Sequence, residues 1–299
     1  MNHPPLELTV RVGCHVVWLA SIPVATTLTL RPRDNPHQKV LQQQLTFAPH
    51  LASFSFEDGL GNQVDRVIMQ PGENIIHHDA IVQVPSTPDN FEPTGLTVPV
   101  YQLPPDVLRY ILPSRYCDSD KLMTFAWKTF GPLGDGATRV QEICDWVHTN
   151  IEYRFGSGSA EISASEVILR RYGVCRDFAH CAIAICRCFN IPARYVTGHL
   201  PDIGHLDPGT PMDFHAYFEV FLGQHWSTFD ARFNEPRIGR IKIAHGLDAV
   251  DGAFSTIYGE SQIKWFEVWA YQINPAEVSL GDPVDLSKRL DGTSVVRRW

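Results

Sequence analysis

The front part of the chain alternates between apolar and polar positions with the two-residue period of β-strands. Turn-forming pairs such as Asp58-Gly59 and Pro71-Gly72 separate the runs, and no helical period intervenes. Short strands in this arrangement predict an antiparallel β-sandwich, which we assign to residues 1–103. The predicted strands cover residues 8–12, 24–30, 44–47, 54–56, 64–67 and 75–84.

After a proline-rich stretch at residues 85–113, the apolar positions recur with the period of helices. This pattern predicts an α+β domain over residues 104–273, in which helices come first and strands follow. Residues 274–299 are polar without a clear pattern, and we expect a surface tail. The predicted helices cover residues 106–112, 120–130, 138–150, 165–171 and 175–189, and the predicted strands 151–155, 193–199, 215–222, 226–230, 238–244 and 264–273.

Charge and composition restrict the partners and the compartment. The chain has 25 basic and 33 acidic residues, a net charge of −8, and no basic cluster longer than Arg297-Arg298. This balance disfavours nucleic acid and anionic membrane as partners. The apolar segment 16–30 contains Pro23, is too short to span a bilayer and lacks a basic flank, so we interpret it as a strand. Without a visible targeting signal, the expected location is the cytoplasm.

The seven cysteines indicate reduced thiols, because their number is odd and they lie inside apolar periodic runs. Cys186 and Cys188 are too close together for a zinc knuckle. His77 and His78 would point to opposite faces of a strand. The sequence therefore predicts no metal site and no cofactor.

One cysteine has a different position. Cys175 follows the glycine turn at Gly173 and begins the apolar helical run that Asn190 and Pro192 terminate. The unpaired N–H groups and the dipole at a helix N-terminus stabilise a thiolate, so we expect a lowered pKa for Cys175. Position alone leaves a second interpretation open, in which Cys175 is one more buried thiol.

A predicted hairpin places two further groups together. A two-residue turn at 223–224 pairs Tyr217 with Asp230, which puts His215 and Asp230 on one face, diagonally opposed. The backbones of such diagonal neighbours lie about 7–8 Å apart, a separation that two side chains can close to a hydrogen bond. If the helix of Cys175 packs on this sheet, a relay of nucleophile, base and orienting acid results. The alternative is a histidine at the core edge and an aspartate in a turn.

Four segments, in this order along the chain, resemble the bacterial transglutaminase-like family. Two more segments fit its pattern: residues 146–153, and the β-rich front part that precedes the core in many members. The four segments are residues 172–180 around Cys175, 190–198, 213–220 around His215, and 228–232 around Asp230.

This resemblance implies a papain-like α+β core, with the nucleophile on a helix packed against an antiparallel sheet. It implies the catalytic triad Cys175, His215 and Asp230. The backbone N–H of Cys175 would be the first donor to the oxyanion of the intermediate, and we suggest Tyr153 as the second, although core packing would also explain this tyrosine. Arg176 and Asp177, beside the nucleophile, could form an ion pair or contact the substrate, and we expect a solvated ion pair.

Three functions follow from these features. The leading one is hydrolysis of a peptide, isopeptide or other amide bond through a thioester. The second is acyl transfer to an amine, which uses the same triad, and the third is a non-catalytic scaffold that binds a protein partner. The expected partner is a peptide or another amide-bearing substrate. The front domain could cover the cleft, bind a partner or mediate assembly of a homo-oligomer, and the sequence leaves these roles open.

Overall fold

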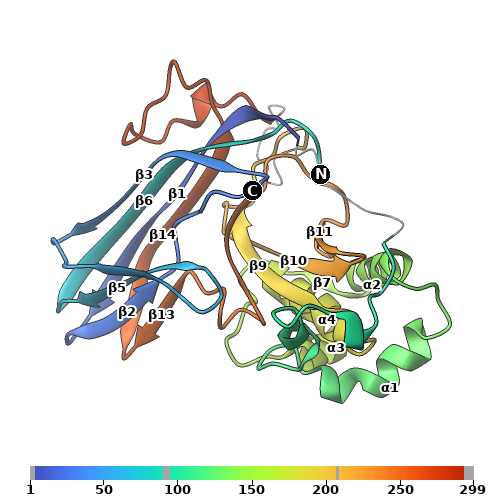
Figure 1. The fold of residues 1–299 in the computed structure, drawn as a ribbon. Helices are drawn as coiled ribbons and strands as arrows, with labels where there is room; N and C mark the ends of the chain where they lie inside the picture. The colour runs from blue at the N-terminus through green and yellow to red at the C-terminus, as the bar shows by residue number, and fades with distance from the viewer. Residues whose placement is uncertain (1–3, 90–94, 207–208, 293–299) are drawn as a thin grey trace.

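Two four-stranded antiparallel sheets pack face to face in a sandwich, on the left of Figure 1. The computed structural model describes residues 4–89, 95–206 and 209–292. One sheet has the order β14-β1-β6-β3 and the other β13-β2-β5-β4. Their strands are β1 (Leu6–Ala20), β2 (Val24–Leu28), β3 (Lys39–Ala48), β4 (Phe54–Glu57), β5 (Gln63–Met69), β6 (Gly72–Pro85), β13 (Ser255–Tyr258) and β14 (Ser261–Gln272).

The alternation seen in the sequence produces this sandwich because it gives strands such as β2 and β5 one apolar face to bury. In β2 and β5 buried and exposed positions alternate, and the buried side chains meet those of β1 and β6 in one core. Val16, Leu28 and Met69 lie at the centre of this core and are at most 1% exposed. The predicted front sandwich is therefore confirmed.

The back of the chain completes the sandwich. β14 pairs antiparallel with β1 from Val10↔Gln272 to Ala20↔Ser261, and β13 pairs with β2. The sequence pattern places residues 255–272 in the α+β domain, and these hydrogen-bonded pairs correct that boundary. The pairing joins segments more than 200 residues apart, so no local signal could reveal it.

The segment between the two halves of the sandwich forms the α+β core. Its sheet has the order β11-β10-β9-β12, with every pair antiparallel. A two-stranded parallel ribbon, β7-β8, lies beside it. These elements are α1 (Ser119–Phe130), α2 (Ala137–Asn150), β7 (Glu152–Tyr153), α3 (Ala164–Arg170), β8 (Tyr172–Gly173), α4 (Cys175–Arg187), β9 (Ala193–His199), β10 (His215–Leu222), β11 (His225–Phe229) and β12 (Ile241–Gly246).

Helix α4 is the central element of this core. Every residue from Asp177 to Arg187 is buried, because α1, α2 and α3 pack on one side of the helix and β9 and β10 on the other. Beyond the helix, Asn190 has a φ of 54°, the left-handed conformation that ends a helix before a proline. The hydrophobic run around Cys175 is thus a buried helix, as its sequence predicts.

The hairpin of β10 and β11 has the predicted register. Leu222 pairs with His225 and Phe218 with Phe229, and the turn residue Gly223 has a φ of 63°. The short helix expected over residues 106–112 is instead a 3-10 turn, Leu108–Ile111.

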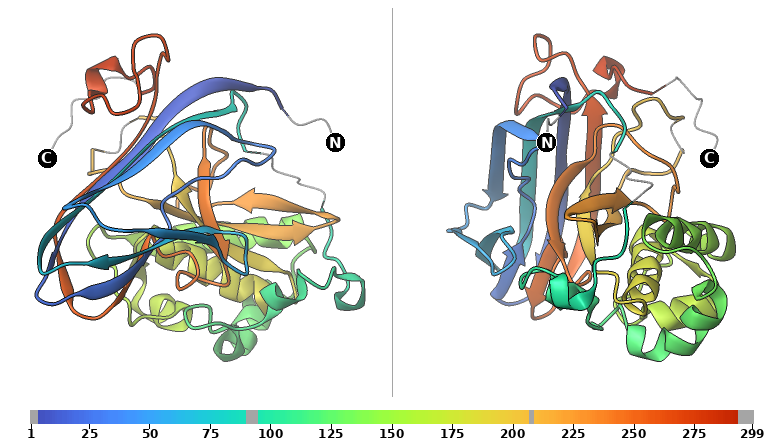
Figure 2. Two further views of the ribbon diagram at one scale, coloured as in Figure 1. Left: turned by 60° about the vertical axis from the view of Figure 1, so that its left-hand side comes forward. Right: turned by 45° about the vertical axis from the view of Figure 1, so that its right-hand side comes forward.

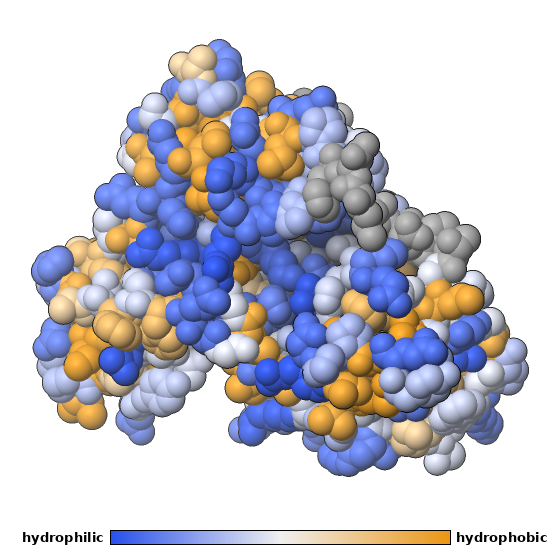
Figure 3. Space-filling view, viewed as in Figure 1, coloured by the Kyte–Doolittle hydropathy of each residue, from blue (hydrophilic) through white to orange (hydrophobic). Residues whose placement is uncertain are grey.

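Figure 2 shows the helices on the side of the core away from the sandwich. The core sheet lies between them, since Phe214, Ile243 and Ala244 share a hydrophobic cluster with the sandwich. In the space-filling view the two lobes separate along the lower edge of the molecule (Figure 3). No helix in the described ranges is long and apolar enough to cross a membrane.

The described part of the C-terminal segment is anchored rather than free. Val278 is 4% exposed and packs with Trp269 and Tyr271 of β14. The N–H of Gly281 donates to the buried carboxylate of Asp79 at 2.9 Å. Most of residues 274–292 are exposed, as expected of a surface segment, and these contacts anchor the segment to the sandwich.

Candidate active site

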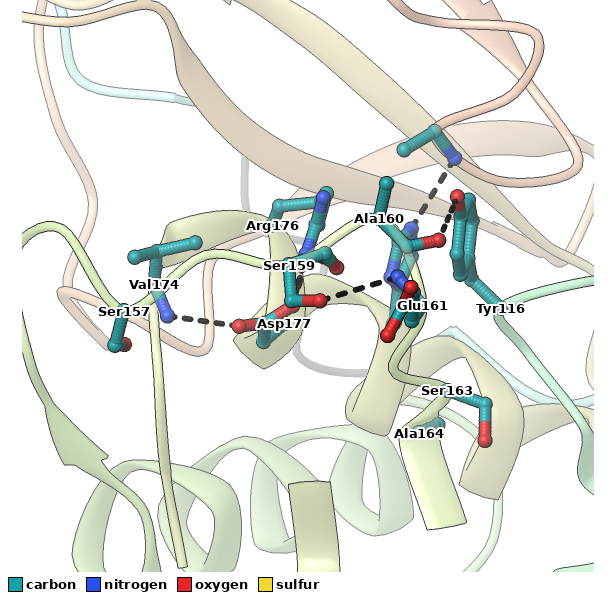
Figure 4. A network of polar contacts seen from close by, with 12 residues as sticks. Tyr116, Ser157, Ser159, Ala160, Glu161, Ser163, Ala164, Val174, Arg176 and Asp177 are labelled. Atoms are coloured by element: carbon teal, nitrogen blue, oxygen red, sulfur yellow. Dashed lines mark hydrogen bonds and ion pairs between the residues drawn. The ribbon is translucent and has the colours of Figure 1, made fainter. Parts of the chain in front are cut away.

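The first turn of α4 is held by an unusual cap. Asp177 accepts a hydrogen bond from the N–H of Val174 at 3.0 Å, and its own N–H donates to the Val174 carbonyl at 2.8 Å (Figure 4). Its carboxylate also binds Arg176 at 2.9 Å and Arg170 at 3.1 Å. Because the Asp177 side chain is 0% exposed, the expected solvated ion pair is wrong: this pair is a buried part of the helix cap.

The same cap explains the glycine before the nucleophile. A Cβ at Gly173 would lie 2.7 Å from the Asp177 carboxylate, so a larger residue would displace the cap. Arg176 extends the network by donating from Nη2 to the carbonyl of Ser159 at 2.6 Å. Figure 4 shows how this contact connects the loop of Ser159 to the start of the helix. The residues on both sides of Cys175 are therefore held in place: Val174 by Asp177, and Arg176 by Asp177 and Ser159.

Cys175 and His215 line one cleft. The Sγ atom of Cys175 lies 3.8 Å from the carbonyl oxygen of Phe214, the residue before His215. The cleft has a volume of about 140 Å³, and Tyr153 also lines it. The opposite wall comes from β14 and the C-terminal segment, including Trp269 and Leu286.

The predicted contact between His215 and Asp230 is present. The Nε2 atom of His215 lies 2.7 Å from Oδ2 of Asp230, and both side chains are less than 10% exposed. The other carboxylate oxygen accepts the N–H groups of Arg232 at 3.0 Å and Phe233 at 3.2 Å. An imidazole that donates through Nε2 to a carboxylate keeps Nδ1 as a proton acceptor.

Burial controls the protonation of these groups. Burial raises the pKa of the Cys175 thiol to about 12, and the carboxylate of Asp213 acts in the same direction. Burial also lowers the pKa of His215, against the opposing effect of Asp230. Burial raises the pKa of Asp230, but the charges of His215 and Arg240 outweigh burial and lower this pKa below its ordinary value.

These directions correct one expectation from the sequence. The lowered pKa expected for Cys175 is wrong, because the loss of water and the nearby Asp213 outweigh the backbone N–H groups of Ala216 and Arg176. Although Cys175 is partly exposed, the cleft gives its sulfur little access to solvent. Both shifts favour the neutral forms of the thiol and the imidazole in the resting site.

We expect the alkylation of Cys175 by iodoacetamide to accelerate as pH rises in the unliganded protein. A raised thiol pKa leaves little thiolate near pH 7, and the thiolate is the reactive form. Mass spectrometry of the labelled peptide at several pH values measures this rate, with the fully buried Cys181 as an internal control. A rate that stays constant between about pH 5 and 8 would reveal a thiolate–imidazolium pair and contradict the neutral state.

Tyr153 lies on β7 and lines the cleft of Cys175. The guanidinium carbon of Arg232 is 3.9 Å from the centre of its ring. Burial and then the neighbouring Cys175 raise the pKa of the Tyr153 phenol, so its hydroxyl stays protonated. Its ring also packs against the core cluster around Phe178. A role for Tyr153 as the second donor stays a prediction.

Sequence reasoning missed several residues of the site. Arg240 donates from Nη2 to Oδ2 of Asp230 at 2.8 Å, and Asp213 lies beside the nucleophile. Arg240 follows a loop without periodicity, so only the folded chain reveals its partner. Among the described residues, no group of three or more histidines, cysteines, aspartates or glutamates could hold a metal ion.

Comparison with known proteins agrees with this geometry. Residues 124–231, which include Cys175, His215 and Asp230, match the sequence profile of the transglutaminase-like superfamily. A crystal structure of a putative cysteine protease from Cytophaga hutchinsonii superposes with a TM-score of 0.81 and 32% identity. The superposition covers 89% of this chain and 91% of that protein.

Proteins of unknown function from mycobacteria are also similar. Those from Mycobacterium bovis and Mycobacterium tuberculosis are 29% identical over 182 residues, which is 57% of this chain. The alignment spans 58% of the length of each of these relatives. One from Mycobacterium leprae is 23% identical over 236 residues, covering 75% of this chain and 82% of that protein.

The profile spans the nucleophile helix and the hairpin, and the solved relative extends the likeness to the sandwich. The α+β fold, with its strand-rich front part and papain-like core, is therefore shared along nearly the whole chain. The chain belongs to the transglutaminase-like superfamily.

Proposed function

We propose that the protein is a thiol-dependent hydrolase of peptide, isopeptide or other amide bonds. Cys175 is the nucleophile, His215 the general base and acid, and Asp230 the residue that orients the imidazole. The observation that carries the proposal is the 2.7 Å hydrogen bond from buried His215 to Asp230, beside the thiol at the start of α4. A scaffold would have no use for this arrangement.

The neutral resting state determines the order of proton transfers. As Sγ of Cys175 attacks the amide carbonyl, the thiol proton passes to Nδ1 of His215, and a tetrahedral oxyanion forms. The imidazolium then donates that proton to the leaving amine, which departs as the carbon–nitrogen bond breaks. A thioester remains on Cys175, and water activated by His215 hydrolyses it to a carboxylic acid and the free thiol.

Two features of the site assist these steps. Asp230 stabilises the imidazolium that forms transiently, since its lowered pKa keeps it ionised at neutral pH. Cys175 begins α4, where the backbone N–H groups have no partner within the helix, so its N–H is the first donor to the oxyanion and the hydroxyl of Tyr153 the second.

The cleft supports a role for the sandwich in substrate binding. Residues of β14, including Glu267 and Trp269, line the cleft opposite Cys175. A substrate that reaches the sulfur therefore passes between the core and the sandwich. Of the three roles left open for the front domain, this favours covering the cleft.

A library of peptides and cell-wall fragments tests the proposal. Incubation with the wild-type protein and with Cys175→Ala, followed by mass spectrometry, should reveal cleavage products that only the wild type forms. Equal product profiles for the two proteins across the library would contradict the hydrolase and favour the scaffold.

The fate of the thioester separates hydrolysis from acyl transfer. In the presence of a labelled primary amine, we expect the acid product to exceed the amide product, because water is in large excess over the amine and Cys175 lies in a cleft that a water molecule can enter. Product mass distinguishes the two: hydrolysis adds one water, whereas transfer adds the amine. If the amide dominates at millimolar amine, the protein is an acyl transferase with the same triad.

A further inference from the structure

Arg240 has an unusual position directly behind Asp230. Its side chain is 5% exposed and reaches the site from the loop before β12. Nη2 donates to Oδ2 of Asp230 at 2.8 Å, and this is the same oxygen that binds Nε2 of His215 at 2.7 Å. One carboxylate oxygen of Asp230 is therefore hydrogen-bonded to both the guanidinium of Arg240 and the imidazole of His215.

The rest of the guanidinium is held just as firmly. Nε donates to Oδ2 of Asp89 at 2.5 Å, and the guanidinium carbon lies 4.7 Å from the centre of the Tyr217 ring. Nη1 is buried and has no hydrogen-bond partner among the described residues. A buried cation with an unsatisfied donor is costly, which indicates that its charge or its placement serves the neighbouring site.

We propose that Arg240 is the positioning residue of the triad. It fixes the carboxylate of Asp230 and shares its charge, so that Asp230 orients the imidazole of His215 without drawing a proton onto it at rest. This inference rests on the proposed function, in which His215 must be neutral to accept the thiol proton.

The charges around His215 explain how Arg240 affects the protonation of the imidazole. Asp230 attracts a proton to the imidazole, whereas Arg240 and the more distant Arg237 oppose it. Arg237 is itself paired with Asp202 at 3.2 Å. Other titratable groups near the imidazole are Asp89 behind Arg240 and Tyr217 on the same strand. The cleft that His215 lines also contains Cys175, Asp202, Asp213, Arg232, Glu267, Arg289 and Asp291.

Substitutions that change this balance in opposite directions test the proposal. Arg240→Met removes the cation and should raise the pKa of His215 by about one pH unit or more, the size expected of a charge at this range. Asp89→Asn removes the second partner of Arg240 and leaves its charge uncompensated, so the same pKa should fall. Arg240→Lys keeps the charge and should restore a value close to wild type.

The measurement is an NMR titration of labelled histidine, made in the Cys175→Ala background so that the thiol does not titrate with the imidazole. Arg11→Met is the matched control, because Arg11 is also a buried arginine, bound to Asp79 at 2.9 Å in the sandwich. It should destabilise the fold without moving the His215 titration. Where a hydrolysed substrate is known, the acidic limb of kcat/KM should shift upward in Arg240→Met by the same amount.

The outcomes separate this inference from the proposed function. An unchanged His215 titration in Arg240→Met, together with a lower Tm, would make Arg240 a structural residue and overturn the inference. If Arg240→Met does not fold, the Asp89→Asn variant provides the test. A His215 pKa that is not lower in Asp89→Asn than in the reference protein would then overturn the inference. Neither result depends on turnover, whereas the proposed hydrolase is tested by the products that the wild type and Cys175→Ala form.

Discussion

Replacement of Cys175 by alanine is expected to reduce amide hydrolysis by about 10³-fold or more, because no other group in the cleft can form the thioester. The fold should survive, since Cys175 is partly exposed and the hydrogen bonds of the helix cap are made by Val174 and Asp177. We expect the free energy of unfolding to change by less than about 1 kcal/mol. Initial rates on a peptide hit from the library and urea unfolding measure the two effects.

Cys181→Ala is the matched control for this prediction. Cys181 lies in the same helix but is 0% exposed and packs in the core. Its truncation should lower stability and leave the rate per folded molecule close to wild type. Hydrolysis that persists in Cys175→Ala and disappears in Cys181→Ala would assign the nucleophile elsewhere.

Replacement of Asp177 by asparagine is expected to lower the free energy of unfolding by about 2–4 kcal/mol. Asp177 is 0% exposed and compensates two arginines, Arg170 and Arg176, that would then share one neutral partner. Both arginines are partly exposed, and access to water limits the loss. Urea unfolding measures the effect, and the rate of hydrolysis should also fall because the cap positions Cys175.

Asp120→Asn provides the control for this effect. Asp120 is also an acidic residue in the first turn of a helix, α1, but it is exposed to solvent. Its loss should cost less than about 0.5 kcal/mol. Equal losses for the two variants would mean that the buried network around Asp177 contributes no more than a surface charge.

Local patterns in the sequence predicted the parts of the fold that depend on neighbouring residues. The turn at Gly223 fixed the register of β10 and β11, and this register brought His215 to Asp230. The apolar run after Cys175 gave the central helix, and alternation gave the sandwich strands.

The sequence could not predict contacts between segments far apart along the chain. Nothing local distinguishes a strand that joins the core sheet from one that joins the sandwich, so β14 was assigned to the wrong unit. The partnership of Arg240 with Asp230 and Asp89 also depends on how three segments meet. The protonation of Cys175 was missed for the same reason, because burial is set by the whole fold.

The pairing of β1 with β14 has a consequence for synthesis on the ribosome. The edge of β1 that β14 covers stays open until residue 272 has left the exit tunnel, whereas the intervening core is contiguous and can fold earlier. An exposed edge of this length is a site where nascent chains associate wrongly. We therefore expect the nascent chain to need chaperones until β14 has been synthesised and pairs with β1.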